Sequence, residues 1–177
     1  ESTGDFSLGG WLSDVRAAAA HVRELADVRD VWLAGFGTGG ALGICAASVD
    51  PAIRGVAAMA PPADFEDWAS DPRRLLQHAR ELGAIRSGSF PPAFDTWAAE
   101  LKTIKAVDAA AELAPRPLLL VHGADDDVVP TLDSRVIADA HAGAELRIIG
   151  GADHRLRFDP RAMALFLGWL DRQRHEV

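Results

Sequence analysis

Two short polar segments carry the side chains best suited to catalysis. Residues 123–127 (GADDD) directly follow one apolar run, and residues 151–154 (GADH) directly follow the next. If both runs are parallel strands, the two segments meet at the same edge of a sheet. A carboxylate of the first segment could then orient the imidazole of His154 and stabilise its charged form, so that the histidine serves as a general base.

A glycine-rich turn lies upstream of both segments. Residues 31–40 (VWLAGFGTGG) begin as an apolar run and end in a glycine cluster, and a small-residue, helix-compatible run follows over 41–47. This order predicts a buried strand, a tight turn and a helix. Two known functional motifs have this strand–turn–helix order. The nucleophile elbow, G-x-S-x-G, exposes a catalytic serine, and the dinucleotide fingerprint, G-x-G-x-x-G, holds a pyrophosphate on backbone N–H groups.

The two motifs make different demands on the rest of the chain. Gly35 and Gly39 match the outer glycines of the elbow, with Gly37 in place of serine. The fingerprint is matched by Gly35, Gly37 and Gly40, but it also needs an acid about 20 residues on, at the end of the next strand. The nearest acid there is Asp64, and dinucleotide binding leaves both polar segments unexplained. A dinucleotide-binding protein is therefore the weaker alternative.

Apolar runs and helix-like stretches alternate along the chain. The expected strands are 31–34, 53–60, 117–122 and 146–149, and the expected helices are 11–25, 39–47, 132–141 and a last one from 160. Thr131 is expected to cap the third of these helices. Because the strands are continuous apolar runs, they predict an α/β fold with a mostly parallel sheet covered on both faces. Residues 63–113 lack a strand signal and predict a helical excursion, either a crossover or a lid.

Length and composition limit the classes of function. The 177 residues, 49% of them hydrophobic, suit a single globular domain over 1–177. The net charge of −8 disfavours nucleic acid as a partner, and no apolar run approaches the roughly 18 residues of a membrane span. The single cysteine, Cys45, fits a reducing, cytoplasmic compartment and a packing role. No secretory leader is visible, and we expect no cofactor and no metal.

Three motifs in this order resemble those of the α/β-hydrolase superfamily. Residues 35–40 (GFGTGG), 122–130 (HGADDDVVP) and 151–154 (GADH) resemble the elbow, acid and histidine motifs of its small bacterial esterase-like branch. Residues 1–5 (ESTGD) are similar to the loop that precedes the helix before the elbow. The resemblance covers nearly the whole chain and implies a three-layer α/β sandwich.

Carried over position by position, the resemblance implies roles for four residues. Asp126 takes the acid position and His154 the base position, and the backbone N–H of Thr38 becomes an oxyanion donor. The nucleophile position falls on Gly37, which has no side chain. Losing the nucleophile of a working triad costs on the order of 10⁶ in turnover. Glycine tolerates the strained elbow backbone, so we expect the shape of the turn to persist without its chemistry.

A second departure from the family concerns strands that precede the helix at 11–25. Those strands, and the loop that supplies the second oxyanion donor, have no counterpart in the sequence. The strand at 31–34 would then be an exposed apolar edge, which favours pairing with another strand. We expect that edge to be covered by further chain upstream or by another chain, for example a second copy in a homo-oligomer.

The sequence thus favours an esterase or acyl-hydrolase-type protein that is inactive or weak as written. A pocket between the elbow, His154 and the helical excursion would hold a small apolar or acyl-type ligand. Two alternatives stay open: a non-catalytic pseudoenzyme that binds such a ligand, and an enzyme in which Asp126 and His154 activate water directly. Thr38 is not expected to replace the nucleophile, because its side chain lies one step along the turn.

Other polar and aromatic side chains have simpler interpretations. His122 is expected to shape the end of its strand, and Asp125 and Asp127 to face solvent or form turns. Trp68 and Trp97 are expected either to line a pocket or to pack in the core. The remaining histidines, all expected on helix surfaces, are His21, His78, His141 and His175.

Overall fold

The computed structural model describes residues 4–175. The strands are β1 (Val31–Phe36), β2 (Ile53–Met59), β3 (Leu118–Gly123) and β4 (Glu145–Ile149). The helices are α1 (Leu8–Arg23), α2 (Thr38–Val49), α3 (Glu66–Ser70), α4 (Pro72–Glu81), α5 (Phe94–Thr103), α6 (Ala106–Leu113), α7 (Thr131–His141) and α8 (Pro160–His175). A 3₁₀ turn, Leu156–Phe158, precedes α8. Of residues 1–5, which resemble the loop that precedes the helix before the elbow, residues 1–3 lie outside the described residues, and α1 begins at Leu8.

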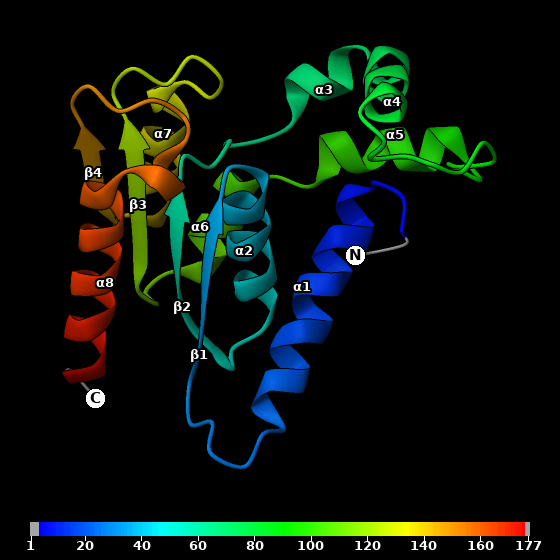
Figure 1. Ribbon diagram of the computed structural model, residues 1–177. Coiled ribbons are helices and arrows are strands. Elements are labelled where there is room, and N and C mark those ends of the chain that lie inside the picture. The colour runs from blue at the N-terminus through cyan, green and yellow to red at the C-terminus, as the bar shows by residue number, and fades with distance from the viewer. Residues whose placement is uncertain (1–3, 176–177) are drawn as a thin grey trace.

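All four strands run parallel in the order β1-β2-β3-β4. The register pairs Ala34 with Ala57, Ala58 with Leu120, and Leu120 with Leu146. The carboxyl ends of all four strands therefore meet at one edge of the sheet, at the top of Figure 1. Within the described residues β1 pairs with β2 alone, so its other edge has no strand partner there.

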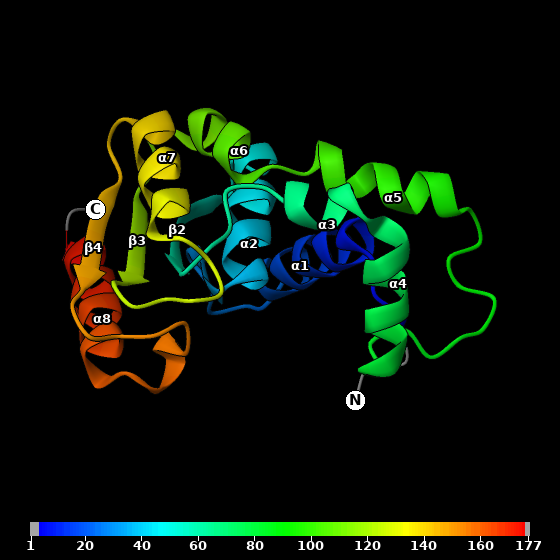
Figure 2. The same ribbon diagram turned by 90° about the horizontal axis from the view of Figure 1, so that it is seen from above.

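Helices cover both faces of the sheet, as the apolar strands predict. Seen from above, α8 lies on one face and α2, α6 and α7 lie on the other (Figure 2). On the α8 side, the ring of Trp169 meets Trp32 edge-on at 5.5 Å between centroids. On the other side, every residue of α2 from Gly40 to Ala47 is buried. Such an apolar helix is stable only inside a core, which is where the sheet, α1 and α6 place it.

Residues 63–113 contain the helices α3 to α6 and no strand. Of these, α6 packs beside α2 and α7 in the layer that covers the sheet, whereas α3, α4 and α5 lie to one side, next to the N-terminal half of α1 (Figures 1 and 2). The indole N–H of Trp97 donates to the carbonyl of Phe6 at 3.1 Å and fixes α5 against the segment before α1. The lid and crossover roles stay predictions.

The ends of several elements depart from expectation. β1 continues past Ala34 to Phe36, because Phe36 still pairs with Met59 on the neighbouring strand. The prediction that Thr131 caps its helix is wrong: Pro130 occupies the cap position, and Thr131 is the first residue of α7. No helix in the described part of the chain is both long and apolar enough to cross a membrane.

Candidate active site

The turn between β1 and α2 has the backbone conformation of a strained elbow. Gly37 adopts φ +52° and ψ −128°, a region that L side chains rarely enter and glycine enters without penalty. Its N–H donates to the carbonyl of Met59 at 2.8 Å, and its carbonyl accepts the N–H groups of Gly40 and Ala41. These bonds fix Gly37 between the end of the strand and the start of the helix.

The acid loop after β3 and the histidine loop after β4 are in direct backbone contact. The N–H of Asp125 donates to the carbonyl of Ala152 at 3.0 Å, and the N–H of Ala124 donates to the carbonyl of Ile149 at 2.9 Å. The backbones approach so closely that a Cβ at Gly123 would overlap the Ala152 carbonyl oxygen. A glycine there is what allows the two loops to meet.

Asp126 is the acid that this contact presents to the histidine. Its side chain is fully buried, and one carboxylate oxygen, Oδ1, accepts the backbone N–H groups of Val128 and Val129 at 2.9 Å each. The other oxygen, Oδ2, lies 2.9 Å from Nδ1 of His154. Burial alone raises the pKa of Asp126, but the N–H of Val129, the side chain of His154 and the N–H of Val128 together outweigh it and hold that pKa below its ordinary value.

His154 faces both the acid and the elbow. With Nδ1 bonded to Asp126, its other ring nitrogen, Nε2, lies 3.4 Å from the place where a Cβ on Gly37 would stand. The imidazole is 28% exposed, so one side stays open to solvent. Asp126, His154 and Gly37 thus form a line in which a base, oriented by a carboxylate, points at the vacant side-chain position of the elbow.

A pocket of about 360 Å³ opens in front of this line. Its walls come from the elbow, the histidine loop, the acid loop and the start of the helical excursion. Its lining residues are Gly37, Thr38, Pro62, Asp64, Phe65, Glu66, Asp67, Trp68, Val128, Val129, Pro130, Asp133 and His154. The rings of Phe65 and Trp68, 5.2 Å apart between centroids, form its aromatic wall.

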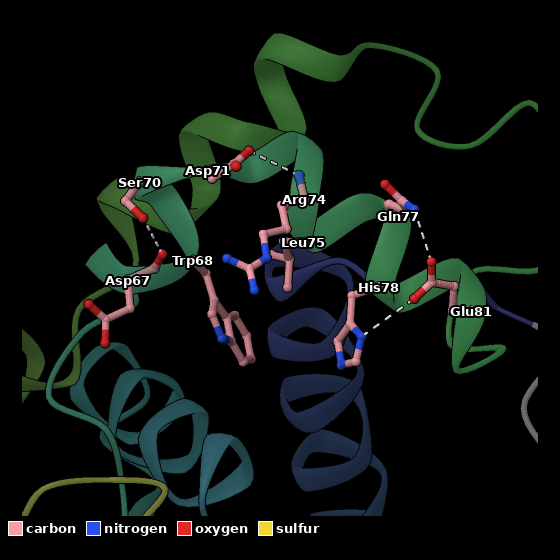
Figure 3. Close-up of a pocket in the computed structure, with 9 residues that line it drawn as sticks. All are labelled: Asp67, Trp68, Ser70, Asp71, Arg74, Leu75, Gln77, His78 and Glu81. Carbon is pink, nitrogen blue, oxygen red and sulfur yellow. Dashed lines mark hydrogen bonds and ion pairs between the residues drawn. The ribbon is translucent and has the colours of Figure 1, made fainter.

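A second hollow of about 530 Å³ lies along α3 and α4 and shares Asp67 and Trp68 with the first (Figure 3). Its polar side chains bond mainly to one another: Ser70 donates to the carbonyl of Asp67, and Gln77 donates to Glu81. They bring no nucleophile together with a base. Within the described residues, no group of three or more histidine, cysteine or acidic side chains could hold a metal ion.

The structure brings together the four residues that the family resemblance singles out. Gly37, Thr38 and His154 line one pocket, and Asp126 lies directly behind His154. Asp125 and Asp127 are exposed, as expected. Trp68 lines the pocket, whereas Trp97 is buried and packs. Of the two roles expected for the tryptophans, Trp68 therefore has the pocket-lining one and Trp97 the core-packing one.

One histidine differs from expectation, and another makes a contact that was not predicted. His141 was expected on a helix surface, but it is buried and its Nε2 lies 2.9 Å from the carbonyl oxygen of Arg116. The side chain of His175 lies outside the described residues. His122 is expected to shape the strand end, yet it also lies 3.2 Å from Oδ2 of Asp126. Its position directly before the glycine of the acid loop was the only sequence signal for that contact.

Comparison with known proteins places the fold. Est1E from Butyrivibrio proteoclasticus superposes with a TM-score of 0.68 at 23% identity, over 91% of this chain and 67% of its own. The α/β hydrolase GrgF from Penicillium sp. sh18 gives 0.70 at 19% identity, over 97% and 73%. A lipase-esterase related protein from Clostridium acetobutylicum gives 0.66 at 18% identity, over 97% and 78%. No family model matches the sequence, and no curated protein sequence matches it.

These superpositions define the class: the chain has the α/β-hydrolase fold. It spans between 67% and 78% of the length of the three proteins. The nucleophile elbow of this fold is a strand–turn–helix, and β1, Gly37 and α2 have that arrangement. The dinucleotide interpretation of the same glycines gains no support from the fold.

Proposed function

We propose that this chain carries an esterase- or acyl-hydrolase-type site that keeps its acid, its base and its elbow but has no nucleophile. One observation carries the proposal. Gly37 has the strained elbow backbone, and a Cβ atom placed on it would lie 3.4 Å from Nε2 of His154. A serine there would reach that nitrogen with its hydroxyl, as a nucleophile must reach its base. As written, the protein should hydrolyse esters weakly or not at all.

The surroundings of Gly37 support the same reaction class. Thr38 is the first residue of α2, where a backbone N–H has no intrahelical acceptor and the helix dipole is positive. Its N–H is therefore suited to stabilise the oxyanion of an acyl-transfer intermediate. Phe65, Trp68 and Val129 give the pocket apolar surface that suits an acyl chain.

Gly37→Ser tests the proposal. The introduced hydroxyl oxygen would attack the ester carbonyl carbon while its proton passes to Nε2 of His154. The C–O bond to the alcohol would then break and the alcohol would leave with that proton. Water would hydrolyse the acyl-enzyme by the same route. Across a series of short-to-medium acyl esters we expect a gain on the order of 10³-fold or more over the chain as written.

Two matched variants separate chemistry from strain. Gly37→Ala carries the same backbone strain, on the order of 1–3 kcal/mol, without a hydroxyl, and should stay inactive. Gly39→Ser adds a serine to the same turn at a position whose Cβ meets nothing within 4 Å, and should also stay inactive. Adding His154→Ala to Gly37→Ser should abolish the gain. If the folded Gly37→Ser variant is inert, the proposed site is wrong.

Two further functions fit the same geometry. Apart from the chain neighbours of Gly37, only His154 among the described residues comes within 4 Å of its side-chain position, so a water could stand there and be deprotonated directly. Ester turnover by the chain as written that is lost in His154→Ala would support this water-activating enzyme. Retention of an acyl-type ligand without turnover would instead support a binding pseudoenzyme, since the pocket is formed without a nucleophile.

A further inference from the structure

A second histidine lies behind the acid of the candidate site. His122, near the end of β3, has a fully buried side chain. Its Nε2 lies 2.9 Å from the carbonyl oxygen of Val129 and 3.2 Å from Oδ2 of Asp126. Both of these neighbours can only accept hydrogen bonds when the carboxyl group is ionised. Nε2 of His122 must therefore carry a proton, which it donates to the carbonyl of Val129 with Oδ2 of Asp126 close beside it.

Ser134 fixes that proton in place. This residue lies in the first half of α7, is fully buried, and places Oγ 2.7 Å from Nδ1 of His122. A neutral imidazole that carries its proton on Nε2 has an accepting Nδ1, so the serine hydroxyl donates to it. The hydroxyl selects the tautomer of His122, as an outer hydrogen bond selects the tautomer of a metal-ligating histidine.

The two carboxylate oxygens of Asp126 are held by different elements. Oδ1 is fixed by the acid loop itself, through the N–H groups of Val128 and Val129. Oδ2, the oxygen that faces His154, also lies 3.2 Å from Nε2 of His122, whose hydrogen bond goes to the carbonyl of Val129. Without His122, the loop would still hold Oδ1, but among the described residues only His154, which is partly exposed, would place a side-chain nitrogen beside Oδ2.

We propose that Ser134 and His122 form a positioning pair that aims Oδ2 of Asp126 at His154. The orientation of the base is then set from α7 and β3, not only from the loop that carries the acid. Neither residue touches the pocket, so both act through Asp126. The catalytic consequence rests on the proposed function, whereas the positioning itself does not.

His141 provides an internal comparison. It is also buried and also bonds a backbone carbonyl through Nε2, but its Nδ1 has no hydrogen-bond partner. His122, in contrast, has a hydrogen-bond partner on each ring nitrogen, and its Nε2 also lies 3.2 Å from the acid of the candidate site. A histidine that merely filled the core would need no such chain of polar contacts.

The positioning can be tested in the chain as written by following the Nδ1–H proton of His154 by NMR. That proton should be shifted far downfield and slow to exchange, because Asp126 accepts it. We expect Ser134→Ala and His122→Leu to broaden or shift the signal. His122→Gln retains an amide donor and should restore it. His141→Leu removes an equally buried imidazole and should leave it unchanged.

Kinetics in the Gly37→Ser background give a second readout. Ser134→Ala should lower kcat by about 10- to 100-fold, as outer-shell changes do at metal sites, with KM little changed. A signal unchanged in both Ser134→Ala and His122→Leu would overturn the positioning pair, and if His122→Leu does not fold, Ser134→Ala decides alone. An inert Gly37→Ser would defeat the proposed function and leave the NMR test intact.

Discussion

Nδ1 of His154 and Oδ2 of Asp126 lie 2.9 Å apart although 28 residues separate them in the chain. The parallel register of β3 and β4 explains this distance. Leu120 pairs with Leu146, so both strands end at the same level and their loops share backbone hydrogen bonds. The carboxylate is buried and the imidazole is partly open, which is the order required for an acid that orients a base.

The lowered pKa of Asp126 predicts a pH-dependent stability. Burial opposes ionisation, but the N–H groups of Val129 and Val128 and the side chain of His154 favour it, so the folded pKa lies below the unfolded value of about 4. The stabilisation is then present above pH 4 and is lost as pH falls through the folded pKa.

Asp126→Asn should therefore lower the free energy of unfolding at pH 7, and the deficit should shrink in acid. Denaturant unfolding of both proteins between pH 2 and pH 7 measures it. A deficit that stays constant over this range would contradict the assignment. Asp125→Asn, at the exposed neighbour, is the control and should show no deficit.

Asp133 predicts the opposite dependence. Burial, together with the nearby charges of Asp64 and Asp67, raises the pKa of Asp133 despite the N–H that it accepts from Ala63. Its ionisation costs stability, so the penalty is absent below the unfolded pKa and grows as pH rises through the folded one. Asp133→Asn keeps an oxygen for Ala63 and should raise the Tm at pH 7 but not at pH 3. Asp139→Asn, exposed on the same helix, serves as the control. An equal rise at both pH values would count against this cause.

The charge of the pocket predicts selection among substrates. Asp64, Glu66, Asp67 and Asp133 line it, and no lysine or arginine does so among the described residues. Glu66 pairs with Lys105 at 2.7 Å. Gly37→Ser should hydrolyse a neutral ester faster than an ester of equal length whose acyl chain ends in a carboxylate.

Because exposed charges are screened by salt, this preference should weaken at high ionic strength. It should also weaken in Gly37→Ser with Asp67→Asn, whereas Asp95→Asn, on α5 outside the pocket, should leave it unchanged. The rates to compare are kcat/KM values for the ester pair. Equal rates for the two esters at low salt would refute the prediction.

Cys45 should not react while the protein is folded. Burial, with a smaller contribution from Asp108, raises the pKa of the thiol to about 12, so the reactive thiolate is scarce at neutral pH. A coloured disulfide reagent at pH 8 should modify the thiol only in denaturant. Fast modification of the native protein would show that α2 opens readily.

Much of the fold follows from local patterns. The four apolar runs and the glycine turn predict the strands and the elbow. The last helix, expected from 160, does begin at Pro160, and Oδ1 of the preceding Asp159 accepts the N–H of Arg161 in its first turn. Element ends were less predictable. The sequence predicts Thr131 as the N-cap of α7, but Pro130, in extended conformation, occupies that position. No side chain of the described residues caps α7.

The residues of the candidate site that belong to motifs could be predicted from the sequence. The contacts that arise from tertiary packing could not. Gly37, Asp126 and His154 each follow a strand signal. The contact between His122 and Ser134 has no sequence signal, because it joins the end of β3 to α7 through tertiary packing. His141 was placed on the surface for the same reason: its partner, the carbonyl of Arg116, lies 25 residues away.

The central claim is that the elbow, the acid and the base are in place and that the elbow lacks its nucleophile. Intact-protein mass spectrometry after treatment with a fluorophosphonate tests it most directly, because a serine aligned with His154 attacks phosphorus and expels fluoride. Gly37→Ser should gain one phosphonyl adduct at position 37, and adding His154→Ala should suppress it. The chain as written and Gly37→Ala should gain none. A folded Gly37→Ser that stays unlabelled, or that labels equally well without His154, would contradict the account.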